Sequence, residues 1–135
     1  MLRPMDAAQA LADLTEISSQ IEAAVLFDES GTVQGSTLAD AGAAEELARR
    51  AAELLERAGG FRSESPVSQL EVSTADGSVF VVRDGARRIA GTTGPTPTVG
   101  LVFYDLKSCL RSAAEEPPKP KRARKKKAEE SEGDA

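Results

Sequence analysis

The chain has 135 residues, 40% of them hydrophobic, and a formal net charge of -5, so it can form one compact domain and is too short for two ordinary ones. It contains no histidine and a single cysteine, which excludes histidine-dependent catalysis, an internal disulfide and a thiolate metal cluster. No segment matches the P-loop or GxGxxG patterns, so the chain does not resemble a GTPase or a dinucleotide-binding enzyme.

The first predicted element is a helix that begins near Asp6. Asp6 followed by Gln9 resembles a capping box, in which the aspartate accepts a backbone N–H and the glutamine reaches back to the cap. Apolar residues then recur at three- and four-residue spacing, as on one face of a helix: Leu11, Leu14, Ile17 and Ile21.

A hairpin is predicted next. Residues 22–27 are apolar on both alternating faces, which indicates a central strand that is covered on both sides. Residues 28–31 read Asp-Glu-Ser-Gly and supply a turn, and residues 32–38 alternate as the second strand.

A long helix is predicted over residues 43–58, with Asp40 as its N-cap and a Gly-Gly pair as its stop. One face of this helix is apolar and rich in alanine and leucine. The opposite face places glutamates four residues before arginines, the orientation that favours ion pairs. These pairs include Glu45 with Arg49 and Glu46 with Arg50.

Three further strands are predicted over residues 67–74, 78–83 and 87–93, each joined to the next by a turn that contains glycine. Residues 98–113 are ambiguous, because they are rich in strand formers and yet keep helical spacing. We favour a helix there, with Thr96 as the cap and Pro97 in the first helical position. Cys109 is then interpreted as a small packed apolar side chain.

The C-terminal segment differs in composition from the rest of the chain. Residues 1–114 carry 16 acids and 10 bases, whereas residues 119–127 hold seven bases and no acid. Residues 115–135 offer nothing larger than alanine for a core apart from prolines and charged side chains, which is typical of disorder. We therefore expect a folded domain over residues 1–114 and a disordered basic-then-acidic tail over residues 115–135.

We expect a cytoplasmic protein without an enzymatic activity. No run reaches the ~18 uninterrupted apolar residues of a membrane span, and the first residues lack a secretory pattern. Carboxylates such as Asp28, Glu29 and Asp40 occur where turns and caps need acids. The sequence therefore predicts no catalytic residue, no cofactor, no metal and no small-molecule substrate.

The order helix, hairpin, helix, three-strand meander and helix resembles the Roadblock family, which includes dynein light chains and bacterial regulators of small GTPases. The resemblance covers residues 6–113 and lies in the patterns "IEAAVLFDESGTVQGST", "AEELARRAAELLERAG" and "VFVVRDGARRIAGTTGPTPTVGLVFYDL". It implies an α+β fold, α-β-β-α-β-β-β-α, with a five-stranded antiparallel sheet. One helix would cover one face of this sheet, and two helices would cover the other.

The resemblance also implies a homodimer, in which the strand after the second helix lies at a sheet edge and pairs with a second copy. An unprotected edge of this kind is a liability that dimerisation removes. The residues expected at this dimer interface are Ala48, Ala51, Ala52, Leu55, Leu70 and Val72.

By the same resemblance, the dimer is expected to act as a scaffold or regulator of a Ras-like small GTPase. The candidate residues for partner binding are Glu45, Arg49, Arg50 and Glu53. An arginine finger from this helix is conceivable, but the neighbouring glutamates favour a solvated, ion-paired face instead.

The alternative function is that of an electrostatic tether to nucleic acid, an anionic membrane surface or an acidic protein. Lysines present point charges that suit backbone phosphates without reading sequence. A solubilising tail without a fixed partner is the other interpretation of the same residues. The candidate residues for polyanion binding are Lys119, Lys121, Arg122, Arg124, Lys125, Lys126 and Lys127.

Overall fold

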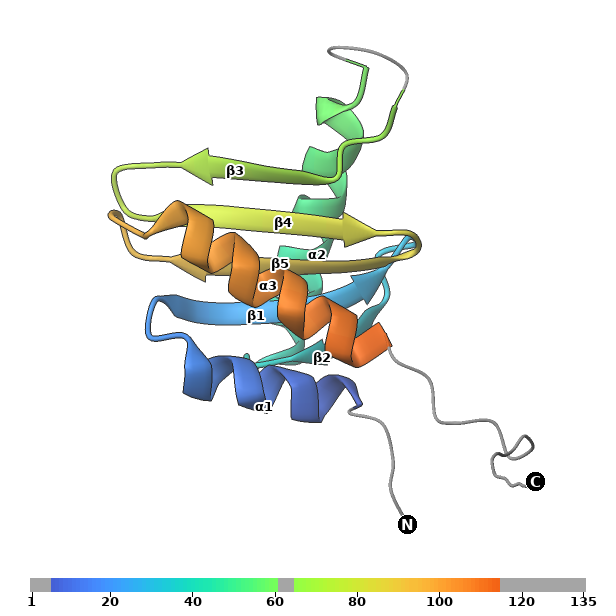
Figure 1. Ribbon diagram of the computed structural model, residues 1–135. Helices are drawn as coiled ribbons and strands as arrows, with labels where there is room; N and C mark the ends of the chain where they lie inside the picture. The colour runs from blue at the N-terminus through green and yellow to red at the C-terminus, as the bar shows by residue number, and fades with distance from the viewer. Residues whose placement is uncertain (1–5, 61–64, 115–135) are drawn as a thin grey trace, which may run out of the picture.

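The computed structural model describes residues 6–60 and 65–114, which form three helices and a single five-stranded sheet (Figure 1). The elements in chain order are α1 (Ala7–Ile17), β1 (Ile21–Asp28), β2 (Val33–Ser36), α2 (Ala41–Ala58), β3 (Gln69–Ser73), β4 (Ser78–Asp84), β5 (Arg87–Thr93) and α3 (Val99–Ala114). This confirms the predicted α+β class and the predicted order of elements. None of the described helices is long and apolar enough to span a membrane.

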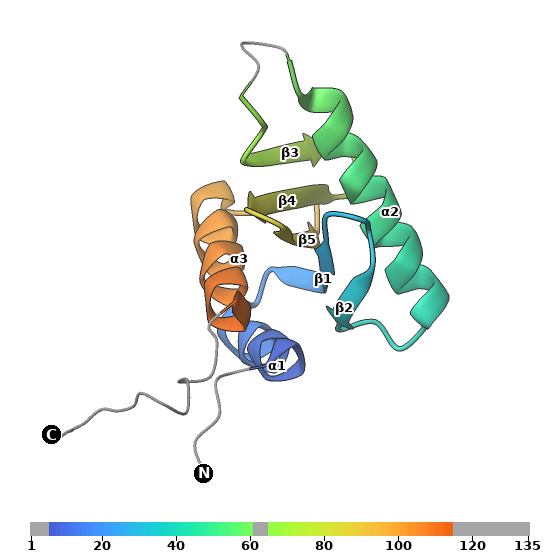
Figure 2. The same cartoon turned by 90° about the vertical axis from the view of Figure 1, so that its right-hand side faces the viewer.

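The strands lie in the order β2-β1-β5-β4-β3, and every neighbouring pair is antiparallel. The strand after the second helix, β3, therefore lies at an edge, as predicted. In Figure 2 the sheet is seen end-on, with α2 on one face and with α1 and α3 on the other. The protein thus has three layers.

Strand β1 shows how the sequence produces these layers. Ala24 and Leu26 contribute to the core on the α1–α3 face, whereas Val25 and Phe27 contribute to the core on the α2 face. All four side chains are buried, because successive residues of a strand point to opposite faces. The prediction of a central strand covered on both sides is confirmed.

The core on the α1–α3 face contains most of the large buried side chains of these helices, including Leu11, Leu14, Leu106 and Leu110. Phe80 of β4 meets Phe103 of α3 edge to face, with ring centroids 5.0 Å apart. The core on the α2 face is built differently. There, three of the four buried α2 residues are alanines, and the fourth is Leu55.

Helix α1 begins as predicted, because the Asp6 Oδ1 accepts a hydrogen bond from the Gln9 backbone N–H at 2.9 Å. The Gln9 side chain donates to Asp13 instead of returning to the cap, so only half of the predicted capping box forms. The helix ends at Ile17, which is 72% exposed, and Ile21 opens β1. The predicted helical stripe is therefore wrong for Ile21, because Ser18 takes an extended conformation and ends the helix. Ile17 is helical as predicted, but its side chain is exposed.

The ambiguous segment near the C-terminus is a helix, as favoured from its spacing. Helix α3 begins at Val99 rather than at Pro97, so the predicted cap at Thr96 is wrong. The Thr98 carbonyl accepts the Val102 N–H at 3.0 Å, and the Thr98 N–H donates to the Gln20 Oε1 at 2.6 Å. A side chain from the α1–β1 junction thus satisfies a backbone group at the start of α3, which no local pattern indicates.

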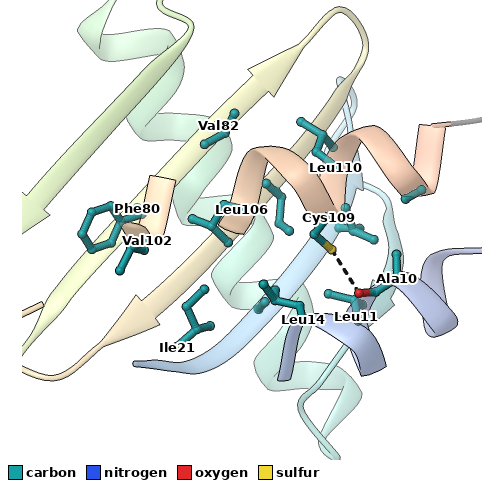
Figure 3. Close-up of a cluster of buried hydrophobic side chains, with 14 residues drawn as sticks. Ala10, Leu11, Leu14, Ile21, Phe80, Val82, Val102, Leu106, Cys109 and Leu110 are labelled. Atoms are coloured by element: carbon teal, nitrogen blue, oxygen red, sulfur yellow. Dashed lines mark hydrogen bonds between the residues drawn. The ribbon is translucent and has the colours of Figure 1, made fainter. Parts of the chain in front are cut away.

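Cys109 is buried, as predicted, and its thiol donates to the Ala10 carbonyl of α1 at 3.4 Å (Figure 3). Burial raises the pKa of this thiol to about 12, and the nearby charge of Asp13 adds to the shift. The cysteine is therefore a packed core residue. Residues 115–135, the predicted tail, lie outside the described residues.

Candidate interaction surface

Helix α2 and strand β3 carry the residues that the sequence nominated for contacts with other proteins. Asp40 caps α2, because its Oδ1 accepts the Gly42 N–H at 3.0 Å, as predicted. The helix crosses the sheet from the β2 side to the β3 side (Figure 2). Its outer surface and the free edge of β3 therefore border one another.

Three residues predicted at the dimer interface are on the wrong side of α2. Ala48, Ala51 and Leu55 are 0%, 1% and 5% exposed, and all three pack against the sheet of their own subunit. Their small size lets α2 lie close to this sheet. From the sequence, we expected the small size of these residues to mean that a second copy of the helix packs there. Side-chain size shows that something approaches closely, but it does not show whether this is the subunit's own sheet or another subunit.

The other three predicted interface residues remain at the surface. Ala52 and Leu70 are partly buried and pack against the core on the α2 face, whereas Val72 is 38% exposed. Strand β3 pairs with β4 in unbroken register from Gln69 opposite Val82 to Ser73 opposite Ser78. Its other edge pairs with no strand among the described residues.

The opposite edge of the sheet is different. Strand β2 has only four residues, and its register with β1 shifts between Leu26 and Phe27. Helix α1 also packs against β2, so closely that a Cβ on Gly35 would lie 2.9 Å from the Cβ of Ala7. Short, irregular and covered edges resist strand addition. Of the two edges, β3 is the one that is open to pairing.

The charged surface of α2 is arranged around Glu46. One oxygen of Glu46 accepts hydrogen bonds from Arg49 at 2.7 Å and from Arg50 at 2.6 Å. The predicted Glu46–Arg50 pair is confirmed, whereas Arg49 binds Glu46 in place of its predicted partner Glu45. The hydrogen bonds from Arg49 and Arg50 lower the pKa of Glu46, and Glu46 raises the pKa of Arg49.

A hollow of about 480 Å³ lies between α2 and the turn that joins β1 to β2. Two of the predicted partner-binding residues, Glu45 and Arg49, line it together with Ala52. Arg50 and Glu53 do not line it. The structure thus brings part of the predicted partner site and part of the predicted dimer surface to the same hollow.

The far wall of this hollow is a turn that Asp28 organises. The Asp28 Oδ1 accepts hydrogen bonds from the Ser30 hydroxyl at 2.8 Å, the Ser30 N–H at 3.0 Å and the Thr32 N–H at 3.0 Å. These bonds lower the pKa of Asp28, the Ser30 hydroxyl most of all. Gly31 completes the turn at a φ of 86°, a conformation that favours glycine. The wall is therefore held in one shape.

Comparison with known proteins gives a structural match. No protein-family model matches the sequence, and no curated protein matches it. A Roadblock/LC7 domain from Streptomyces avermitilis superimposes with a TM-score of 0.71 at 21% identity, over 79% of this chain and 93% of that domain. An MglB structure described as a tetrameric arrangement gives a TM-score of 0.69 at 15% identity, over 80% of this chain and 85% of MglB. MglB from Myxococcus xanthus gives a TM-score of 0.61 at 16% identity, over 78% of this chain and 80% of that protein.

The chain has the Roadblock fold. The resemblance that the sequence suggested is thereby confirmed at the level of the fold. In this domain, the exposed β3 edge and the hollow beside α2 both lie at the surface.

Two arginines of the sheet, Arg83 and Arg88, were not nominated from the sequence. Arg83 and Arg88 are opposite each other on β4 and β5, and Arg88 is also opposite Phe27, which faces α2. The Arg88 Nε is buried without a hydrogen-bond partner in the described part of the chain. Phe27 is in turn opposite Val33 of the hollow. Neighbouring strands are about 4.8 Å apart, so the backbones of Arg88 and Val33 are about 10 Å apart.

The sequence did not indicate that this turn and the two arginines would contribute to a surface, because that role depends on contacts between distant segments of the chain. The Asp-to-Gly turn at residues 28–31 was visible as a turn, but nothing local indicated that α2 would pass beside it. Within residues 6–60 and 65–114, no group of three or more cysteines and acids is placed to hold a metal ion. The seven residues nominated for polyanion binding lie outside the described residues: Lys119, Lys121, Arg122, Arg124, Lys125, Lys126 and Lys127.

Proposed function

We propose that this protein is a non-catalytic, dimeric cytoplasmic scaffold that binds a small Ras-like GTPase and biases its switch loops. The observation that carries the proposal is the hollow beside α2, where Glu45 and Arg49 face the turn held by Asp28. The β3 edge, on the far side of the sheet from this hollow, pairs with no strand among the described residues and is available to a second copy. The Roadblock fold supports the proposal, since that family includes regulators of small GTPases.

The physical basis is positioning rather than chemistry. Phosphoryl transfer is accelerated when groups of the GTPase itself are held in place, and switch loops are segments that become ordered by new contacts. A surface that orders those loops promotes hydrolysis or stabilises one nucleotide state. The chain needs no acid, base or nucleophile of its own for this role.

The charges of the site indicate how a partner is held. Arg49 and Arg50 are both bound to Glu46, so neither is a free guanidinium poised for insertion into an active site. Arg83 and Arg88 lie side by side, and like charges directly opposite one another in a sheet are unfavourable. A carboxylate from a partner would relieve this repulsion. The surface therefore suits a partner with acidic side chains next to its switch loops.

The dimer is tested by light scattering after size exclusion. Val72→Lys places a charge on the β3 edge, and Gln34→Lys places the same charge on β2, where Gln34 is also exposed. A dimer of this class buries about 800 Å² per subunit, so we expect the Val72 variant to show half the mass of the wild type and the Gln34 variant to be unchanged. A wild-type monomer at micromolar concentration would contradict the dimer.

GTPase binding is tested by pull-down and titration with nucleotide-loaded Ras-like GTPases from the same genome, beginning with any that is encoded next to this chain. Reversal of a charge that faces a partner changes affinity by about tenfold or more, so we expect this loss from Arg49→Glu. Lys107→Glu on α3 is the matched control, because Lys107 is exposed on the opposite face of the sheet. Failure of every such GTPase to bind in any nucleotide state would defeat the proposal.

A second candidate function rests on a separate observation, the seven bases within residues 119–127. A tail of this kind binds nucleic-acid backbones or anionic surfaces without sequence preference, and its affinity falls steeply with salt. Fluorescence anisotropy with duplex DNA tests it, by comparison of the wild type with Lys125→Ser, Lys126→Ser, Lys127→Ser. Identical binding curves for the two proteins would contradict this second function.

A further inference from the structure

A groove of about 230 Å³ lies between α1 and α3, on the face of the sheet opposite α2. Ala10, Leu14 and Cys109 contribute to its lining, and Figure 3 shows these three side chains where the two helices meet. Ile17 and Tyr104 also line it and are 72% and 64% exposed. None of the residues considered so far for a dimer or a GTPase belongs to this groove.

Exposed apolar side chains gather at one end of the groove. Leu101 is 48% exposed and precedes Tyr104 by three residues on α3, so the two side chains lie on the same side of the helix. Ile17 and Tyr104 thus form an exposed apolar rim of the groove, and Leu101 lies next to Tyr104 on α3. Within the described residues, the other large exposed apolar side chains are Val99, in the first turn of α3, and Val72 of the β3 edge.

The groove is also acidic. Asp13 and Asp105 line it, and no basic residue does. Asp105 is only 6% exposed overall, and it lines the groove. The arrangement favours an occupant that brings a cation and an apolar surface together.

The sequence directly after α3 has this chemistry. Residues 117–122 read Pro-Pro-Lys-Pro-Lys-Arg, which is a PxxP pattern followed by two cations. PxxP segments adopt the polyproline II helix and dock in grooves lined with aromatic side chains. Prolines would pack on Tyr104 and Ile17, and a cation would reach Asp105 and Asp13.

The length of the chain allows this contact within one subunit. Helix α3 ends at Ala114, and Tyr104 lies ten residues earlier, which is about 15 Å along a helix. Residues 115 and 116 can reverse the direction of the chain. From there a polyproline II segment advances about 3.1 Å per residue, so five residues cover the same 15 Å. Lys121 then lies at the level of Tyr104, with Asp105 one residue away.

We propose that residues 117–122 dock in the groove between α1 and α3 of their own subunit, with the prolines on the apolar rim and the cations on Asp13 and Asp105. The occupied groove covers the exposed ring of Tyr104 and places a cation beside Asp13 and Asp105. The distal cations, Arg124 to Lys127, stay available to other anions. This inference does not rest on the proposed binding of a GTPase.

The chain contains its own reporter. Tyr104 is its single tyrosine, and there is no tryptophan, so intrinsic tyrosine fluorescence arises in the groove alone. A tethered segment has an effective concentration of about millimolar, so even a weak site is occupied for most of the time, and acrylamide should quench the full-length wild type about twofold less than a variant with an empty groove. That variant is Pro117→Ser, Pro120→Ser, Lys121→Ser.

Two controls separate docking from a general effect of charge. Lys125→Ser, Lys126→Ser, Lys127→Ser removes cations just beyond the docked segment and should leave quenching of Tyr104 as in the wild type. On the groove side, Asp13→Lys should release the segment, whereas Glu16→Lys on the same helix, at an exposed position outside the groove, should not. Amide NMR shifts of Ile17 and Leu101 should move with the quenching and give an independent measurement.

Equal quenching of the wild type and the proline variant, with unchanged amide shifts around the groove, would overturn the proposal. Quenching of the wild type that rises to the level of the variant on dilution would show that the segment comes from another copy, and it would overturn the assignment to the same subunit. Protection that persists on dilution and disappears in Asp13→Lys supports the proposal.

Discussion

The two faces of the sheet are covered in different ways. On one face, α1 and α3 interlock with the sheet through leucines and the Phe80–Phe103 pair. On the other face, α2 lies alone and meets the sheet mainly through Ala44, Ala48 and Ala51. Large side chains fix helices by interdigitation. Small ones bring a single helix close to the sheet and leave its charged outer surface for contacts with other proteins.

The largest expected loss of stability is on the sheet face that α1 and α3 cover. Phe80 and Val81 are adjacent on β4, fully buried and on opposite faces. Phe80→Ala should lower the free energy of unfolding by about 3–5 kcal/mol, and Val81→Ala by about 1.5–3 kcal/mol, because fewer atoms are lost and a smaller cavity remains. Urea denaturation followed by circular dichroism measures both. Equal losses would contradict the difference between the faces.

The reactivity of Cys109 probes how tightly α1 and α3 close. Burial raises the pKa of this thiol from 9.0 to about 12, so at pH 9 the folded protein holds about five-hundredfold less thiolate than the unfolded chain. Alkylation by iodoacetamide should be slower by up to that factor, and its rate should keep rising above pH 9 where that of the unfolded chain levels off.

A cysteine on the other face provides the comparison for this measurement. Ala52→Cys, in a Cys109→Ser background, places the thiol beside the hollow at a partly buried position. It should react much faster than Cys109 at the same pH. Similar rates for the two cysteines would show that the α1–α3 face opens as readily as the surface of α2.

A smaller loss of stability is expected when a larger side chain is placed in the alanine-rich contact between α2 and the sheet. Ala48 is 0% exposed between α2 and the sheet, so Ala48→Leu should cost about 1–3 kcal/mol by overpacking. Ala43→Leu is the control, because Ala43 is exposed on the same helix. Thermal unfolding compares the two variants. An unchanged melting temperature for Ala48→Leu would show that α2 can move away from the sheet without loss.

The smallest effect concerns the ion pairs on the outer surface of α2. Glu46, Arg49 and Arg50 are about half exposed or more, and pairs of this kind contribute little to stability. Glu46→Gln should leave thermal unfolding unchanged at neutral pH. Because its pKa is lowered in the folded state, any contribution from Glu46 is present above the usual carboxyl range and is lost as the pH falls through it. A clear loss of stability at pH 7 would contradict the assignment of this surface to binding.

The sequence predicted the order of elements and most of their bounds, because the necessary signals are local. Periodicity, turn glycines and the caps Asp6 and Asp40 place seven of the eight elements, and spacing alone favoured the helix for α3. The first helix was extended too far, because Ile17 and Ile21 keep helical spacing although the chain changes to a strand between them.

The interaction surface was harder to predict for a physical reason. Alanines at helical spacing indicate that something approaches closely, but they do not say whether it is the sheet of the same subunit or a second copy. Ala48 and Ala51 were assigned to the second copy and face the sheet. The hollow depends on α2 passing beside residues 30–33, a contact between segments that no local pattern joins.

The difference between the two sheet edges limits how many subunits strand pairing can join. The β2 edge is closed, because α1 packs over Gly35 and because this four-residue strand pairs with β1 in an irregular register. A subunit with two sheet edges open to pairing can add further copies without limit and form fibres. A subunit with one open edge can pair with only one other copy, through a single symmetric contact. The close packing of Ala7 on Gly35 therefore protects the protein against aggregation through its sheet.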